Sequence, residues 1–247
     1  MRRLAFPAAA LLVAVACSGG SSPILTTPSP PVGTPSATAT VAPPSTPAPT
    51  PSLPPGVPTS YGKDVAAGDV PLDALVPSGA SVDNSWYATL PAGDAIVVAY
   101  EEASGDPFQA PRGLVVWRHF DTVPPWRATF GLAHPADEGV LSIDAIVADV
   151  TGDGSPDALV MESTGGSGAC GTWRVLDLAE GTQVWEKGDL CDAQVTPSTT
   201  PVGLTVTQSV FKPNDSHCCP SATRTTTLSY AGNGEWIVAA RKTTPVG

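Results

Sequence analysis

The hydrophobic and polar positions of residues 61–247 follow the pattern of short β-strands. Alternating or continuous apolar runs, rich in Val, Ile, Thr and aromatic residues, are separated by clusters of Gly, Pro, Asn and Asp. A short helix is expected at residues 73–76, and no long stretch has the 3.6-residue period of a helix. The fold class is therefore predicted to be all-β, with strands at residues 85–89, 95–101, 113–119, 128–131, 142–149, 158–162, 173–178, 183–186, 203–210, 225–230 and 236–240.

A weak internal repeat runs through these strands. The segment DAIVVAY at Asp94 is similar to DALVMES at Asp157, and GLVVWR at Gly113 is similar to GTWRVL at Gly171. The spacing of about 50–63 residues is typical of a propeller blade, and chance similarity among valine-rich strands is the alternative. A tryptophan lies on the expected last strand of each of three units: Trp126, Trp185 and Trp236.

The length of this region limits how the units can be arranged. Propellers close with about four to eight blades, and the 187 residues from Tyr61 to Gly247 are too few for that. We expect antiparallel meanders in an incomplete, propeller-like or sandwich-like arrangement. The six tryptophans could offer an aromatic surface, but each is expected in the core: Trp86, Trp117, Trp126, Trp173, Trp185 and Trp236.

The N-terminal residues have the features of an export signal. Arg2 and Arg3 precede a short apolar stretch that is too short to span a bilayer stably. Small residues then lead to Cys17, in the sequence Ala-Val-Ala-Cys followed by Ser-Gly-Gly. Residues 1–16 resemble the signal peptide of bacterial lipoproteins, and Ala14-Val15-Ala16-Cys17 resembles their lipobox. The resemblance implies cleavage before Cys17, acylation of its thiol with chains such as palmitate, and a lipid anchor on the extracytoplasmic face of the cell membrane.

Residues 17–60 are expected to form a disordered tether between the lipid and the β domain at 61–247. Thirteen prolines lie between Pro23 and Pro58, and no charged residue occurs from Leu4 to Gly62. Such a segment cannot form a core and favours extended polyproline II conformations. The β domain holds 10 basic and 23 acidic residues, a net charge of −13. This charge argues against nucleic acid as a partner.

The most specific motif lies at 149–157, between two expected strands. Side-chain oxygens alternate along it at Asp149, Thr151, Asp153 and Asp157, and Ser155 can add its backbone carbonyl. Gly154 permits the sharp turn. Alternating oxygen ligands on a tight loop are how proteins gather Ca²⁺, and three close carboxylates would repel one another without a cation. A metal-free Asp/Gly turn is the alternative.

This motif is not an EF-hand, because Val160 stands at loop position 12 and apolar, strand-like runs flank the loop. It resembles the FG-GAP or VCBS-type repeat of integrin α-like propellers, in which the same Asp pattern joins two strands and binds Ca²⁺. The resemblance implies a structural calcium ion. Gly68–Asp73 is at best a degenerate second copy of this motif.

Four cysteines follow Cys17, and an exported chain with four cysteines is expected to form two disulfides. Cys170 and Cys191 lie symmetrically about an expected hairpin turn at Glu180-Gly181, which favours pairing them with each other. That pairing leaves Cys218 and Cys219 to form a strained vicinal ring. The strain favours the second arrangement, in which Cys218 and Cys219 reach back to Cys170 and Cys191. A soft-metal site using these thiols with a histidine is a remoter alternative.

No motif for catalysis is found. The chain has no Gly-x-Ser-x-Gly elbow, no His-Glu-x-x-His and no phosphate-binding Gly-Lys-Ser/Thr loop. Glu101 and Glu102 are adjacent on a strand, so they point to opposite faces and cannot act as a pair. We therefore expect a non-catalytic, membrane-anchored domain that binds an envelope protein or glycan, or has a structural role. An envelope hydrolase or accessory enzyme using acidic residues is the alternative.

Overall fold

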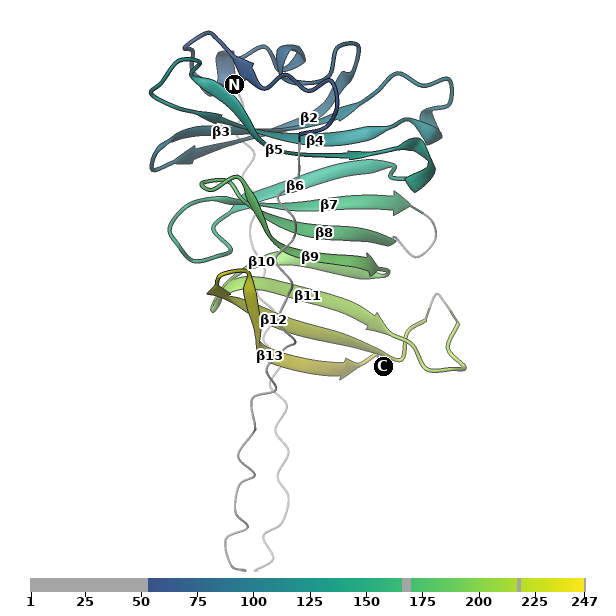
Figure 1. The fold of residues 1–247 in the computed structure, drawn as a ribbon. Helices are drawn as coiled ribbons and strands as arrows, with labels where there is room; N and C mark the ends of the chain where they lie inside the picture. Colours follow the sequence, from purple (N-terminus) through teal and green to yellow (C-terminus); the bar gives the residue numbers. More distant parts are fainter. Residues whose placement is uncertain (1–52, 166–169, 217–218, 247) are drawn as a thin grey trace, which may run out of the picture. The chain divides into compact units, whose positions relative to one another are not determined.

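The computed structural model describes residues 53–165, 170–216 and 219–246, all within the unit formed by residues 40–247. The described residues form antiparallel β-strands in three sheets, with four short 3₁₀ helices and no α-helix (Figure 1). This confirms the predicted all-β fold. None of the described helices is long and apolar enough to cross a membrane. The expected signal peptide and Cys17 lie outside the described residues.

The first sheet contains five strands in the order β1-β5-β4-β3-β2. Its strands β2 to β5 follow one another along the chain as a meander, and the short β1 adds to the edge of β5. The strands are β1 (Ser60–Tyr61), β2 (Ser81–Leu90), β3 (Gly93–Glu101), β4 (Arg112–His119) and β5 (Trp126–His134). The short helices η3 (Pro107–Gln109) and η4 (Ala136–Glu138) lie in connections after β3 and β5.

The second and third sheets are four-stranded meanders in which every strand pairs with the next along the chain. The second contains β6 (Ser142–Ala148), β7 (Asp157–Gly165), β8 (Cys170–Asp177) and β9 (Thr182–Leu190). The third contains β10 (Ala193–Thr199), β11 (Val202–Val210), β12 (Ala222–Gly232) and β13 (Glu235–Pro245).

The internal repeat of the sequence corresponds to equivalent strands of these meanders. Asp94 and Asp157 lie at the start of β3 and β7, the second strands of their four-stranded meanders. Gly113 and Gly171 lie near the start of β4 and β8, the third strands. The three tryptophans Trp126, Trp185 and Trp236 lie on the fourth strands, β5, β9 and β13. Each repeat unit is thus one four-stranded, blade-like meander, to which β1 adds a fifth strand in the first sheet.

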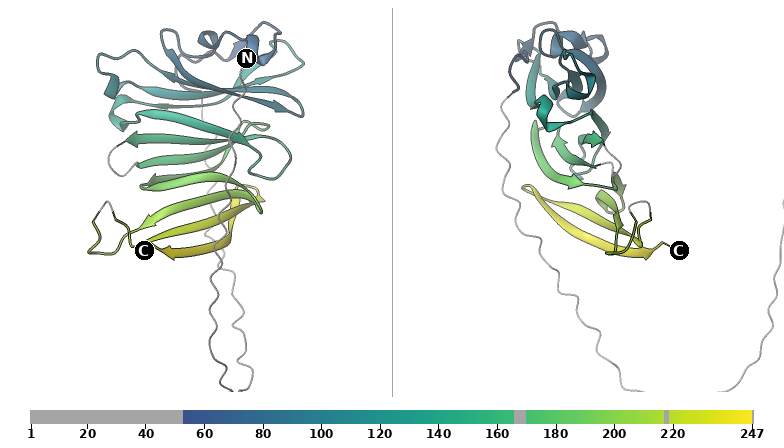
Figure 2. Two further views of the ribbon diagram at one scale, coloured as in Figure 1. Left: turned by 180° about the vertical axis from the view of Figure 1, so that it is seen from behind. Right: turned by 90° about the vertical axis from the view of Figure 1, so that its right-hand side faces the viewer.

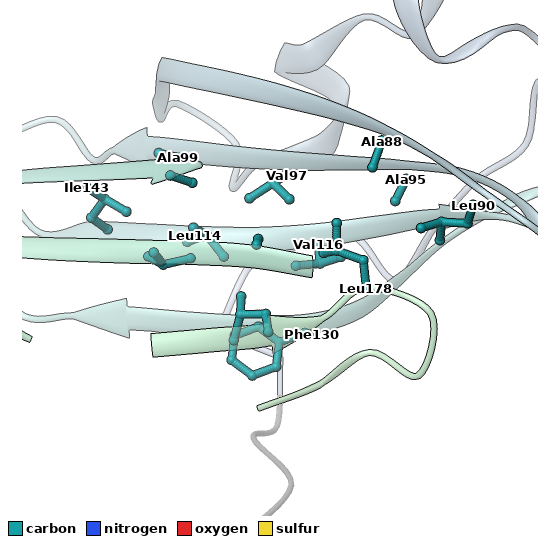
Figure 3. Close-up of a cluster of buried hydrophobic side chains, with 14 of the residues drawn as sticks. Ala88, Leu90, Ala95, Val97, Ala99, Leu114, Val116, Phe130, Ile143 and Leu178 are labelled. Carbon is teal, nitrogen blue, oxygen red and sulfur yellow. The ribbon is translucent and has the colours of Figure 1, made fainter. Parts of the chain in front are cut away.

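The three sheets pack face to face through two apolar clusters. The first cluster joins the first sheet to the second, with Val97, Val116 and Phe130 on one side and Ile143 and Leu178 on the other (Figure 3). The second cluster joins the second sheet to the third, and includes Leu159, Val175, Val195, Leu204 and Trp236. Both faces of the second sheet are therefore buried, which explains the nearly continuous apolar run of β7.

A third apolar cluster covers the other face of the first sheet with residues that precede β2. Val57, Leu75 and Val76 pack there against Trp117 and Trp126, together with η1 (Ala67–Asp69) and η2 (Leu72–Leu75). The Trp117 indole donates a hydrogen bond to the Leu75 carbonyl at 3.1 Å. We call these residues, from Val57 to Val76, the cap on the first sheet. The helix expected at 73–76 is a 3₁₀ helix within this cap. The cap also includes Val57, which the sequence assigned to the tether.

Two strands were not expected from the sequence. Strand β1 has only two residues. Strand β10 combines Thr and Ser with Pro197, a composition that is typical of a loop. Because β10 is an edge strand of its sheet, the missing N–H of Pro197 is tolerated there. The expectation that tryptophans lie in the core is confirmed for four of them, which are buried: Trp117, Trp126, Trp173 and Trp236. Trp86 and Trp185 are half-buried and pack against the apolar clusters.

Candidate metal centre

The loop at 149–157 joins β6 to β7, the first two strands of the second sheet. Asp149 directly follows β6, and Asp157 is the first residue of β7, paired in register with Ala148. Gly152 and Gly154 have positive φ angles of 79° and 88°, which other residues rarely adopt. These two glycines let the chain curl back within the loop, so all five predicted ligand residues lie in one turn between two strands.

Two of the carboxylates in this loop accept hydrogen bonds from its backbone. Asp149 accepts from the N–H groups of Gly152 at 2.6 Å and Gly154 at 3.0 Å. Asp153 accepts from the N–H of Ser155 at 2.7 Å. Asp149 and Asp153 are exposed, whereas Ser155 is buried. These hydrogen bonds hold the loop in its curled conformation and leave lone pairs on both carboxylates facing solvent.

Asp157 is the buried carboxylate of the loop. Its Oδ2 atom accepts three hydrogen bonds, from the N–H of Val150, the N–H of Thr151 and the Thr151 hydroxyl, at 2.9 to 3.0 Å. Its Oδ1 atom is buried and has no hydrogen-bond partner among the described residues. Burial raises the pKa of Asp157 to about 6, although the donors from Thr151 and Val150 oppose the shift.

A fourth carboxylate, which the sequence motif did not reveal, lies beside Asp157. Asp177 at the end of β8 is directly opposite Asp157 in the register of β7 and β8, and its charge contributes to the raised pKa of Asp157. Like charges directly opposite each other destabilise a sheet. Only the strand pairing brings these residues together, so a motif confined to 149–157 could not identify Asp177.

The oxygen atoms of the loop are of the type that Ca²⁺ prefers, namely carboxylates, a hydroxyl and a backbone carbonyl. The buried Oδ1 of Asp157, which has no hydrogen-bond partner among the described residues, fits the role of a cation ligand. In the observed conformation, however, no group of three or more His, Cys, Asp or Glu residues among the described residues could hold a metal ion. Asp149 and Asp153 instead accept hydrogen bonds from the backbone of the loop.

One disulfide is found among the described residues, between Cys170 and Cys191, whose Cα atoms are 3.9 Å apart. The arrangement in which Cys218 and Cys219 bridge to these two cysteines is therefore wrong. The pairing of Gly171 with Leu190 in β8 and β9 explains the outcome, because it brings the residues next to them, Cys170 and Cys191, together at the end of the hairpin. Cys218 lies outside the described residues, and Cys219 lies in the connection between β11 and β12.

The structure also contains a buried ionic cluster that the sequence did not predict. Glu162 on β7 is almost fully buried and lies 2.7 Å from Arg174 on β8 and 3.3 Å from His134 at the end of β5. His134 is also 2.7 Å from Glu138. Burial alone would raise the pKa of Glu162, but His134 and Arg174 outweigh it and lower that pKa. This cluster joins the first sheet to the second and has the features of a structural contact.

Comparisons with known proteins add no family to these observations. No protein-family model, curated protein or solved structure matches the chain.

Proposed function

We propose that this chain is a membrane-anchored extracytoplasmic lipoprotein whose β domain is non-catalytic, is stabilised by calcium and serves in binding or structure at the cell envelope. The observation that carries the calcium proposal is the buried, unpartnered Oδ1 atom of Asp157 in a loop rich in oxygen ligands. A bound Ca²⁺ would satisfy that atom and offset the repulsion between Asp157 and Asp177.

The proposal of an exported location is supported by the sequence before the β domain and by the disulfide. Arg2 and Arg3, the apolar stretch and Cys17 resemble a lipoprotein signal. The Cys170–Cys191 disulfide suits an oxidising compartment outside the cytoplasm. Metabolic labelling with palmitate tests the anchor: the wild-type chain should be labelled and membrane-bound, and Cys17→Ser should lose both properties. Equal labelling of Cys17→Ser would contradict the anchor.

Thermal unfolding with calcium and with chelator tests the proposed ion. At a Ca²⁺ concentration about 100 times Kd, binding adds about 2.7 kcal/mol to the free energy of unfolding, and we expect the Tm to rise by about 5 °C or more. Asp153→Ala should abolish this rise. Asp106→Ala is the matched control, because Asp106 also accepts a hydrogen bond from the N–H two residues ahead but lies outside the loop. A wild-type Tm that is equal in calcium and in chelator would overturn the calcium proposal.

A further inference from the structure

The third sheet has one buried face and one face that no described apolar cluster covers. Val195, Leu204, Val206, Leu228 and Trp236 on its inner face pack against the second sheet. Residues that alternate with these point the other way, because side chains alternate across a strand. In both views of Figure 2 no described strand lies beyond this sheet.

Threonine dominates this second face, which we call the outer face. Directly paired residues of antiparallel strands share a face, so the register defines rows across the sheet, and three of the rows on this face contain threonine. These rows are Thr196-Thr205-Thr227-Ala240, Gln194-Thr207-Thr225-Lys242 and Ser209-Thr223-Thr244. Neighbouring strands are about 4.8 Å apart, and successive residues on one face are about 6.8 Å apart along a strand. The outer face is therefore a regular array of hydroxyl and methyl groups.

The hydroxyl groups of this array are available to a ligand. The threonines of β11 and β12 are half-buried by their neighbours, and Gln194, Lys242 and Thr244 are exposed. Within the described part of the chain, no hydrogen bond engages the seven threonine hydroxyls of the outer face. A ligand with many hydroxyl groups could thus exchange water for hydrogen bonds here without first breaking contacts within the protein.

The charge of the third sheet differs from that of the rest of the domain. Residues 193–247 carry four basic and two acidic residues, whereas residues 61–192 carry six basic and 21 acidic residues. No carboxylate occurs in the three rows, and Lys242 lies in one of them. At physiological salt, charges more than about 8 Å away are largely screened. A negatively charged ligand would therefore be repelled from the first two sheets and accepted at the third.

We propose that the outer face of the third sheet binds an acidic polysaccharide, a polyhydroxyl chain that carries carboxylates. Threonine hydroxyls would hydrogen-bond to sugar hydroxyls, threonine methyl groups would pack on sugar C–H groups, and Lys242 would pair with a carboxylate. The inference deepens the binding role proposed above. It rests on the proposed extracytoplasmic location, because that is where the chain would meet such a polysaccharide. The observation that carries it is the carboxylate-free threonine array in an otherwise strongly acidic domain.

Binding of polygalacturonate to the full chain tests this inference. The chain carries Cys17→Ser, which removes the proposed acylation site so that no detergent is needed. Binding is measured by biolayer interferometry in calcium and in chelator. We expect the double variant Thr207→Val with Thr225→Val to raise Kd about tenfold, since each lost hydrogen bond is worth about 0.5–1.5 kcal/mol. Lys242→Gln should raise Kd about threefold. The double variant Thr207→Ser with Thr225→Ser keeps both hydroxyls and loses only two methyl groups, so it should raise Kd less than the valine variant does.

Matched variants elsewhere serve as controls. Thr89→Val on β2 and Lys187→Gln on β9 make the same chemical changes on other sheets and should leave Kd unchanged. Absence of binding to polygalacturonate, equal binding of neutral dextran, equal binding of polyphosphate, or equal loss in the control variants would overturn the proposal. Self-association by sedimentation that Thr207→Val with Thr225→Val abolishes would instead assign the face to a second copy. Binding of polygalacturonate that persists in chelator would show that this inference can hold even if the calcium proposal fails.

Discussion

His134 and Glu162 connect the first two sheets through a buried ionic contact, with Nε2 of His134 lying 3.3 Å from Oε1 of Glu162. One residue ends β5 and the other lies within β7, so the contact crosses the packed faces of two sheets. The contact matters for stability because both groups are buried. An ionisable pair in this position should make the packing of the sheets depend on pH.

We predict that the domain loses stability as the pH rises above neutrality. Burial alone would lower the pKa of His134, but Glu162 and Glu138 outweigh it and raise that pKa above its usual 6.5. A raised histidine pKa contributes stability that is complete below 6.5 and is lost as the pH rises through the folded value. Urea unfolding at pH 6 and pH 8.5 measures the difference. His134→Gln should reduce it, whereas the control His119→Gln, whose partner Asp64 is exposed, should not.

Removal of the carboxylate from this cluster should be strongly destabilising. Glu162→Ala leaves Arg174 and His134 without their buried partner, and breaking a buried ion pair costs about 3–5 kcal/mol. Asp83→Ala removes an exposed partner of Arg112 and should cost less than about 1 kcal/mol. The free energies of unfolding in urea test this contrast. Similar losses in the two variants would show that the buried cluster stabilises the fold no more than an exposed ion pair does.

The cap on the first sheet should contribute to the free energy of unfolding as much as a core strand does. Leu75 is fully buried, so Leu75→Ala should cost about 2–5 kcal/mol in the free energy of unfolding. Ala74→Gly, at the neighbouring position in the same 3₁₀ helix, removes no buried core side chain and serves as the control. A loss for Leu75→Ala no larger than that of the control, in calorimetry or urea unfolding, would mean that the cap is not packed on Trp117.

The disulfide assignment can be tested chemically. Proteolysis under non-reducing conditions and mass spectrometry should yield a peptide pair linked through Cys170 and Cys191. Replacing both residues by serine should lower the free energy of unfolding by about 3 kcal/mol, the usual cost of opening a loop of this size. A linked peptide that joins Cys170 or Cys191 to Cys219 would contradict the pairing.

The sequence predicted the parts of the fold that depend on local pattern. Apolar and β-branched runs gave the strands that form the core, and the repeat that includes Asp94 and Asp157 gave the blade-like unit. Strand β10 was missed because its Pro197 and hydroxyl residues resemble a loop, and its pairing with β11 decides its structure. The cap was missed because prolines near Val57 suggested a tether.

The sequence predicted only those residues of the candidate site that lie close together along the chain. The residues from Asp149 to Asp157 lie in one turn, as expected, but Asp177 reaches Asp157 through the pairing of β7 and β8. The partners of Cys170 and Glu162 also depend on strand register. Strain in a vicinal disulfide was the wrong criterion for the cysteines, because the register of the hairpin places Cys170 next to Cys191 whatever the other cysteines do.

The most direct test of the calcium loop is the stoichiometry of binding by isothermal titration calorimetry on the full chain. We predict that one Ca²⁺ binds per chain and that Asp157→Asn, which keeps an oxygen acceptor but removes the buried charge, weakens binding at least about tenfold. Asp106→Asn should bind as tightly as the wild-type chain. Absence of binding at about 1 mM Ca²⁺, the upper range for extracellular modules, or equal binding by Asp157→Asn, would contradict a calcium-stabilised domain.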